Sequence, residues 1–177
     1  MTRGSRWSWV LWFKRGGDCD ETGEAWHAER AAAGEPLAQF LHAQRARSRA
    51  ARAEWLRRAA EGGFGRAMGD VGMAYKTGDG VRADTAAAAR WFRRAAAPPH
   101  AEAGATFNLG QALLDGSAEL EAADAALAGL AAPSSDAVAV AVGLFRRAAA
   151  AGSSLAMFNL AVAATKGAGG VAEDLDE

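Results

Sequence analysis

The sequence predicts an all-α protein, an α/α solenoid (superhelix) of antiparallel helix pairs. A six-residue signature, Trp or Leu followed by a bulky apolar residue and Arg-Arg-Ala-Ala, occurs at residues 55–60, 91–96 and 144–149. The first two copies begin 36 residues apart. Such a period is typical of helical repeats whose single units are too small to bury a core of their own. Composition agrees, because 50% of the residues are hydrophobic and the abundant Ala, Leu, Arg and Glu favour helix.

Residues 1–35 are predicted to be an irregular N-terminal segment. The segment holds a short run with Trp7, Trp9 and Trp12, flanked by basic residues. The run is too short to span a membrane and lacks the longer apolar core and small-residue cleavage site of a signal peptide. Three interpretations stay open: a degenerate repeat helix, since residues 12–17 resemble 91–96, an anchor at a membrane interface, or no fixed structure.

The repeat array is expected over residues 36–177. Pro36 suits the first position of a helix, and one long helix near 37–61 is predicted to be the second helix (helix B) of an earlier pair. A complete repeat follows near 64–97, with helix A near 64–77 and helix B near 84–97. Between them, Gly78 is expected to end helix A, and Asp84 is expected to cap helix B.

The later repeats depart from this pattern. The repeat near 101–151 contains an insertion over roughly residues 117–132, which is expected to add a turn or two of helix before a cap at Asp136 or the preceding serines. The repeat near 153–177 is partial, because its helix B signature is not reached. We therefore expect self-association at an open C-terminal repeat, cover by another chain or by further sequence, or fraying of the last helix.

Small and apolar residues at helical spacing predict the core. Ala67, Val71 and Tyr75 recur at i, i+4 and i+8 and form one stripe of a helix. Small residues on such stripes allow close helix approach, and a large ring such as that of Trp91 is expected to be buried in the remaining space. The predicted core residues are Trp55, Ala67, Gly72, Tyr75, Trp91, Leu109, Gly110, Phe145 and Leu160.

The residues between the signatures carry a family resemblance. Residues 67–95 match, at nearly every position, the order Ala-x3-Leu-Gly-x2-Tyr-x2-Gly-x-Gly-Val-x2-Asp-x3-Ala-x2-Trp-x3-Ala. This order resembles the Sel1-like repeat (SLR) family, relatives of the tetratricopeptide repeats. The third copy departs from it, with Ala161 and Ala164 in place of Gly and Tyr. The resemblance covers about residues 50–174 and implies a protein-interaction scaffold or adaptor that binds a partner peptide or domain on its concave face.

One polar position recurs in the predicted A helices. The residue before each Leu/Val-Gly or Leu-Ala pair is Asp70, Asn108 or Asn159. In solenoids of helix pairs, helix A usually lines the concave surface. These residues are therefore candidates for hydrogen bonding to the backbone of an extended peptide, with Met73 and Gln111 beside them. The alternative is that they serve only the packing of neighbouring A helices.

The arginines between residues 45 and 58 suggest an alternative function. Six of them form the clearest charge run in the chain and would suit nucleic-acid binding through one helix. However, only Trp55 interleaves with them and the net charge is −1. A solvated helix face is therefore favoured, and the expected partner is another protein rather than nucleic acid.

The third alternative is an accessory repeat region of an enzyme whose catalytic part lies elsewhere. His27, His42 and His100 are dispersed and do not pair with Cys19 or carboxylates at metal-ligand spacing. We therefore expect no catalytic residue, cofactor or metal site in this sequence. The single cysteine excludes an internal disulfide. Together with the lack of a convincing signal peptide, it favours a cytoplasmic location.

Overall fold

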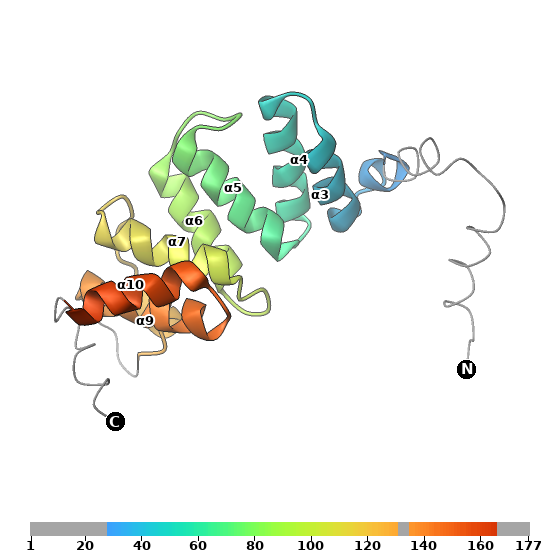
Figure 1. Cartoon of the computed structure of the whole chain (residues 1–177). Helices are drawn as coiled ribbons and strands as arrows, with labels where there is room; N and C mark the ends of the chain where they lie inside the picture. The colour runs from blue at the N-terminus through green and yellow to red at the C-terminus, as the bar shows by residue number, and fades with distance from the viewer. Residues whose placement is uncertain (1–27, 131–134, 166–177) are drawn as a thin grey trace, which may run out of the picture.

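The computed structural model describes residues 28–130 and 135–165. All regular structure in these ranges is helical, and successive helices pack side by side along a curved array (Figure 1), which confirms the all-α solenoid. The principal helices are α3 (Pro36–Arg45), α4 (Arg49–Glu61), α5 (Gly65–Thr77), α6 (Thr85–Ala96), α7 (Ala103–Leu114), α8 (Ala122–Leu127), α9 (Ala137–Ala150) and α10 (Ser154–Thr165). The helices pack as pairs, α3 with α4, α5 with α6, α7 with α9 and α9 with α10, and successive pairs are joined by the contacts of α4 with α5 and of α6 with α7.

The prediction of a single long helix near 37–61 is wrong, because this stretch forms a pair of helices. Pro36 does begin α3, but the chain is extended at Ala46 and again at Ser48. The Ser48 hydroxyl accepts a hydrogen bond from the Ala51 N–H at 3.0 Å and so caps α4. A serine at this position satisfies a backbone donor that would otherwise have no partner at a helix start. Thus α3 and α4 form a complete earlier pair.

The α5–α6 pair follows the sequence prediction closely. Gly78 ends α5 with a φ of 73°, a left-handed conformation that glycine adopts at little cost. Asp84 caps α6 by accepting a hydrogen bond from the Ala87 N–H at 2.8 Å. The turn between these residues packs against the start of α4, since a Cβ on Gly80 would lie only 2.2 Å from the Arg49 carbonyl oxygen.

The second residue of every signature is buried, whereas the first is fully buried only in the third, where it is Leu144. Phe92 is fully buried, and its ring lies so close to Gly72 that a Cβ there would approach it to 2.5 Å. Phe145 is likewise buried, at 2.7 Å from a Cβ built on Gly110. Trp91, which was expected in the core, lies at its margin: it is partly buried and packs against the core, with the Arg94 guanidinium 5.2 Å from its ring.

The remaining predicted core residues divide into two groups. Ala67, Gly72, Leu109 and Gly110 are buried. Trp55, Tyr75 and Leu160 are only partly buried and pack against the core from its edge. The aromatic members cover the core more than they fill it, while the small members set the distance between helices.

The insertion contains the short helix α8 and is anchored by an arginine of the second signature. Arg93 donates to both carboxylate oxygens of Asp124, at 2.8 and 2.9 Å, and also pairs with Glu121 at 2.8 Å. The Asp124 side chain is fully buried. Asp136 caps α9 by accepting from the Val138 N–H at 2.9 Å. The insertion is therefore held onto the α6 edge of the array rather than projecting from it as a separate loop.

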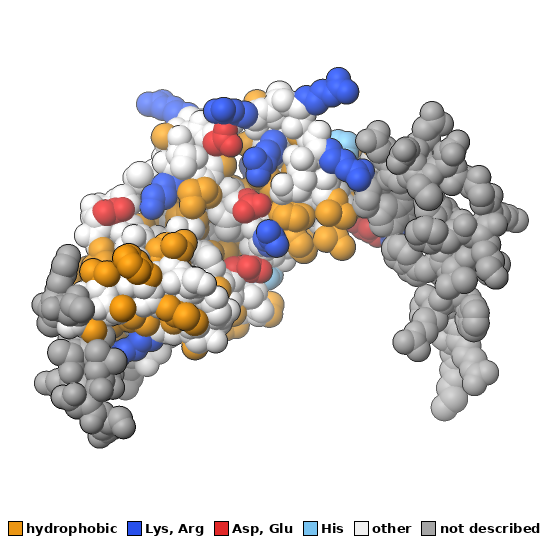
Figure 2. Space-filling view, in the orientation of Figure 1, with side chains coloured by type: hydrophobic (Ala, Val, Ile, Leu, Met, Phe, Trp, Pro, Cys, Tyr) orange, Lys and Arg blue, Asp and Glu red, His pale blue; other side chains and the backbone are white. Residues whose placement is uncertain are grey.

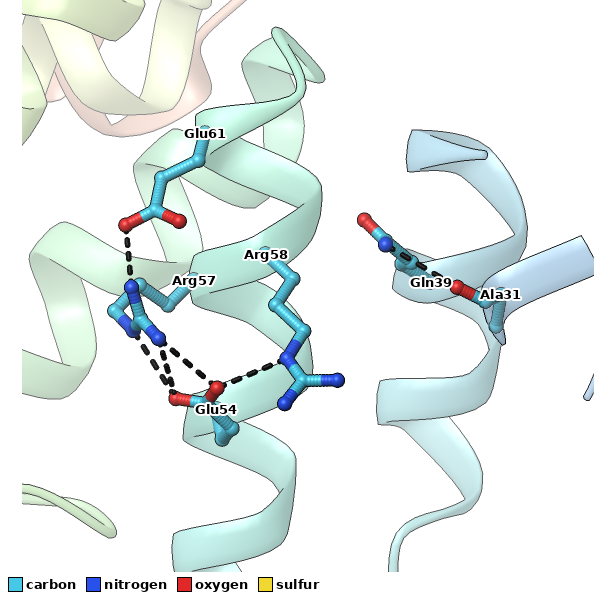
Figure 3. Close-up of polar contacts among 6 residues, drawn as sticks. All are labelled: Ala31, Gln39, Glu54, Arg57, Arg58 and Glu61. Carbon is cyan, nitrogen blue, oxygen red and sulfur yellow. Dashed lines mark hydrogen bonds and ion pairs between the residues drawn. The ribbon is translucent and has the colours of Figure 1, made fainter. Parts of the chain in front are cut away.

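Packing begins before the predicted array boundary at residue 36. Residues 28–32 are helical, and Ala31 is buried. The Gln39 amide donates to the Ala31 carbonyl at 3.2 Å (Figure 3). The prediction of an irregular segment is thus wrong for residues 28–32. Trp7, Trp9, Trp12 and the residues after Thr165 lie outside the described residues. In the ranges that are described, no helix is long and apolar enough to cross a membrane.

Candidate functional site

A cavity of about 200 Å³ lies between α4 and α5, on the side where α5 meets its terminal turn. Two of the residues predicted to bind a partner, Asp70 and Met73, line this cavity together with residues that sequence reasoning had not assigned to a site. The lining residues are Arg49, Arg52, Ala53, Leu56, Asp70, Met73, Ala74, Thr77 and Asp79. Polar and apolar groups therefore share one concave feature of the surface.

Four charged side chains line the cavity. Arg49 and Asp79 form an ion pair, whereas Arg52 and Asp70 do not pair with each other. Arg49 Nε lies 3.4 Å from Asp79 Oδ1, and this surface contact joins the turn after α5 to the start of α4. Arg52 and Asp70 form no hydrogen bond or ion pair in the part of the chain that the structure describes, and Arg52 Nε is buried without a partner. The cavity thus presents a guanidinium donor and a carboxylate acceptor whose bonding capacity is unused.

Burial raises the pKa of the Asp70 carboxyl, because removal from water disfavours its charged form. The positive charges of Arg66 and Arg52 act in the opposite direction and offset only part of this effect. A half-buried carboxylate held at some cost to stability is a feature of functional sites more often than of purely structural ones.

The other predicted binding residues occupy equivalent helices but do not line the cavity. Asn108 and Gln111 lie on α7, and Asn159 lies on α10. All three side chains are half-buried, and they form no hydrogen bond within the described ranges. Met73, beside Asp70, is 38% exposed. The structure therefore brings Asp70 and Met73 into one site and leaves the two asparagines and the glutamine further along the array.

Arg49 and Arg52 were missed as site residues because the sequence appeared to hold them in one arginine-rich helix. The break at residues 46–48 leaves Arg45 at the end of α3 and Arg49 and Arg52 on α4, so the arginine run does not lie on one helix. A signal was nevertheless available. Ser48 is a good N-cap residue, and a helix beginning there places Arg49 and Arg52 in its first turn.

Two further arginines of the run, Arg57 and Arg58, are paired with acidic residues of the same helix (Figure 3). Arg57 donates to Glu54 at 2.9 Å and pairs with Glu61, while Arg58 donates to Glu54 at 2.9 Å. Hydrogen bonds from Arg58 and Arg57 lower the pKa of Glu54. Figure 2 shows basic and acidic side chains interspersed on the face it displays. This arrangement differs from the continuous basic stripe expected of a nucleic-acid site.

The histidines show no sign of metal binding in the described residues. His42 packs edge-on against Trp55, with ring centroids 4.6 Å apart, and His100 lies against Gly65. No cluster of three or more His, Cys, Asp or Glu side chains that could hold a metal ion occurs in residues 28–130 and 135–165.

These features define a class of protein: an α/α solenoid of tetratricopeptide-like helix pairs with a mixed-charge cavity between two of its helices. The Sel1 repeat family model matches residues 53–64, 65–97, 103–128, 128–153 and 154–177. The chain therefore belongs to the Sel1 repeat family. The family model divides residues 103–153 into two repeats, whereas in the structure α7 and α9 pack as one pair with the α8 insertion between them.

Solved structures support the same assignment. A Sel1 repeat protein from Oxalobacter formigenes is 26% identical, with a TM-score of 0.57, over 75% of this chain and 92% of that one. The protective antigen c5321 of uropathogenic Escherichia coli, which displays an SLR fold, is 26% identical with a TM-score of 0.67 over 82% of this chain. This chain spans only 29% of the length of that antigen. No curated protein matches the chain. Sel1 repeat folds generally serve as scaffolds for protein interactions, and they are typically non-catalytic.

Proposed function

We propose that this protein is an interaction scaffold that binds an extended segment of a partner protein along its A helices. The proposal depends on the burial and hydrogen bonding of four polar side chains on the A helices, Asp70, Asn108, Gln111 and Asn159. All four are half-buried, yet none forms a hydrogen bond in the described ranges. Partly desolvated polar groups with unused donors and acceptors favour a partner that supplies the missing hydrogen bonds.

The chemistry of these side chains suits a peptide. Asparagine and glutamine amides both donate and accept, so they can bond to the N–H and C=O groups of a main chain whatever its sequence. Met73 adds a flexible apolar contact beside Asp70, and methionine adapts well to different partner side chains. Among the described residues, these side chains form no hydrogen bond to a neighbouring helix, so hydrogen bonding does not tie the A helices together at these positions.

Nucleic-acid binding through residues 45–58 has weaker support. Arg57, Arg58 and Arg49 are paired with acidic residues, and Arg52 faces the cavity. Too few cations are left on one surface to neutralise a row of phosphates. A salt titration with generic RNA and DNA tests this alternative, because phosphate binding requires an affinity that falls steeply with salt.

The proposal is tested by site-specific photocrosslinking of the whole chain followed by affinity measurement. A photoreactive residue at Met73 is expected to capture a partner that the same residue at Arg90, an exposed position on α6, does not capture. The affinity of the captured protein is then measured for the wild type and for a triple variant, Asp70→Ala, Asn108→Ala and Asn159→Ala. We expect the triple variant to bind at least about tenfold more weakly, since it loses hydrogen bonds at three positions.

The matched control carries Arg82→Ala and Arg90→Ala, two exposed residues away from the A helices. This control should bind as the wild type does, and circular dichroism should show the same helix content in all three proteins. Equal affinity of the triple variant and the control would refute the proposal. Loss of helix in the triple variant would show that the three residues serve packing.

A further inference from the structure

We propose that the cavity between α4 and α5 receives the side-chain amide of a glutamine carried by the bound partner. This inference rests on the proposed function and adds to it the chemistry that the partner must present at one point of the array. In this cavity the Arg52 guanidinium, whose Nε is buried without a partner, and the Asp70 carboxylate line the same space, and neither side chain bonds to any of the described residues.

The charge pattern selects a neutral group that both donates and accepts. Arg52 can only donate hydrogen bonds, and an ionised Asp70 can only accept them. A primary amide satisfies both at once, with its oxygen toward Arg52 and its NH₂ toward Asp70. A carboxylate would suit Arg52 but be repelled by Asp70, and an ammonium group would meet the reverse problem.

The size and the walls of the cavity suit the side chain of a glutamine. Its volume is about 200 Å³, which is room enough for such a side chain. Leu56, Ala53 and Ala74 supply apolar wall, against which the two methylene groups of a glutamine would pack. The lining residues come from α4, α5 and the turn at Asp79, so a side chain that enters between the two helices meets Arg52 and Asp70 together.

The cavity is held in shape without a ligand. The close packing of Gly80 on the Arg49 carbonyl holds the turn against α4, while the Arg49–Asp79 ion pair lies at the surface and adds little. The Thr77 hydroxyl donates to the Met73 carbonyl at 2.9 Å, which fixes a further wall residue. Because little ordering is required on binding, even one side chain can bind with measurable affinity.

The test is a nuclear magnetic resonance titration of the full chain with four capped pentapeptides. All have the sequence Ala-Ala-X-Ala-Ala, with Gln, Glu, Lys or Met at X. We expect the Gln peptide to shift the amide resonances of Ala53, Met73 and Ala74, and to bind about tenfold more tightly than the other three because only it completes both hydrogen bonds. Its binding should be nearly independent of salt, since it carries no charge at X.

Three variants test whether the preference for the Gln peptide arises in the cavity. Arg52→Met and Asp70→Leu each remove one bonding group and should abolish the preference for Gln. Ala53→Leu fills the cavity without a change of charge and should abolish binding of all four peptides. Arg90→Gln, on the exposed side of α6, should leave the titration unchanged. The spectrum of each variant without peptide shows whether the fold persists.

Preference for Glu would overturn the inference and leave an anion site at Arg52, while preference for Lys would leave a cation site at Asp70. Absence of shifts at the cavity with the Gln peptide would also overturn it. These outcomes are independent of the crosslinking experiment, so capture of a partner at Met73 together with a failed titration would refute the glutamine site alone.

Discussion

The central helix α5 and the last described helix α10 carry the same repeat pattern in different surroundings. Met68 and Met157 each follow the repeat alanine directly, yet Met68 is 0% exposed and Met157 is 51% exposed. Four residues further on, Gly72 is buried beneath the Phe92 ring, whereas Ala161 is exposed. The two helices therefore agree in local sequence and differ in burial.

Neighbouring helices explain the difference. α5 packs against α4, α6 and α7, while the main packing partner of α10 among the described residues is α9. Figure 2 shows hydrophobic side chains gathered on the surface over α10, where Leu155, Met157 and Phe158 are 64%, 51% and 66% exposed. The comparison teaches that a repeat specifies a helix and its apolar face, while the adjacent units decide how much of that face is buried.

The largest expected effect concerns the aromatic residue that covers Gly72. Phe92→Ala removes a fully buried ring and should lower the free energy of unfolding by about 3–5 kcal/mol. Trp91→Ala should cost less, because that side chain lies at the margin of the core and is only partly buried. Urea denaturation followed by circular dichroism measures both. A larger cost for Trp91→Ala would restore the sequence-based view that the tryptophan is the centre of the core.

A matched pair of methionines tests the comparison most directly. Met68→Ala should cost about 2–5 kcal/mol through the cavity it leaves, whereas Met157→Ala should stay within about 0.5 kcal/mol. The same denaturation measurement applies. A large cost for Met157→Ala would show that a contact covers α10 in solution, and sedimentation at several concentrations would show whether that contact is a second copy of the chain.

Gly72 and Ala161, four positions after these methionines, should show a smaller difference in the free energy of unfolding. Gly72→Ala places a Cβ at 2.5 Å from the Phe92 ring, so we expect a loss of about 1–3 kcal/mol from overpacking. Ala161→Gly changes only helix propensity at an exposed position and should cost about 1 kcal/mol. If Gly72→Ala were neutral, the close approach of α6 to α5 would not be a requirement of the fold.

The smallest effect is expected at Asp70 and depends on pH. Its folded pKa is raised, so the folded state binds the proton more tightly, and the wild type loses stability as the pH rises through that pKa. Asp70→Asn should therefore be slightly more stable at neutral pH, by less than about 1 kcal/mol because the group is partly solvated. The gain should vanish in acid, below the unfolded pKa. Melting curves across this range would contradict the argument if the variant were less stable at neutral pH.

Much of the fold was predictable because it depends on local signals. The signature spacing located α5, α6 and α9, while Gly78, Asp84 and Asp136 marked helix ends through turn and capping preferences that act within a few residues. The break between α3 and α4 was also encoded locally, at Ser48, but the helix-favouring arginines and alanines around it hid the signal. Two of the nine residues that line the candidate cavity were anticipated: Asp70, from a recurring position in the repeat, and Met73 beside it.

The sequence by itself determined the class of fold, the helix pairs and the polar positions of the A helices, because periodicity and capping are properties of short segments. Only the tertiary structure decided which aromatic residue of the signature is buried, since that depends on where Gly72 and Gly110 lie on the facing helices. It also decided that Arg93 holds the insertion through Asp124, and that Arg52 meets Asp70 in one cavity. These contacts join residues from different helices, and their distances follow from how the helices pack rather than from spacing along the chain.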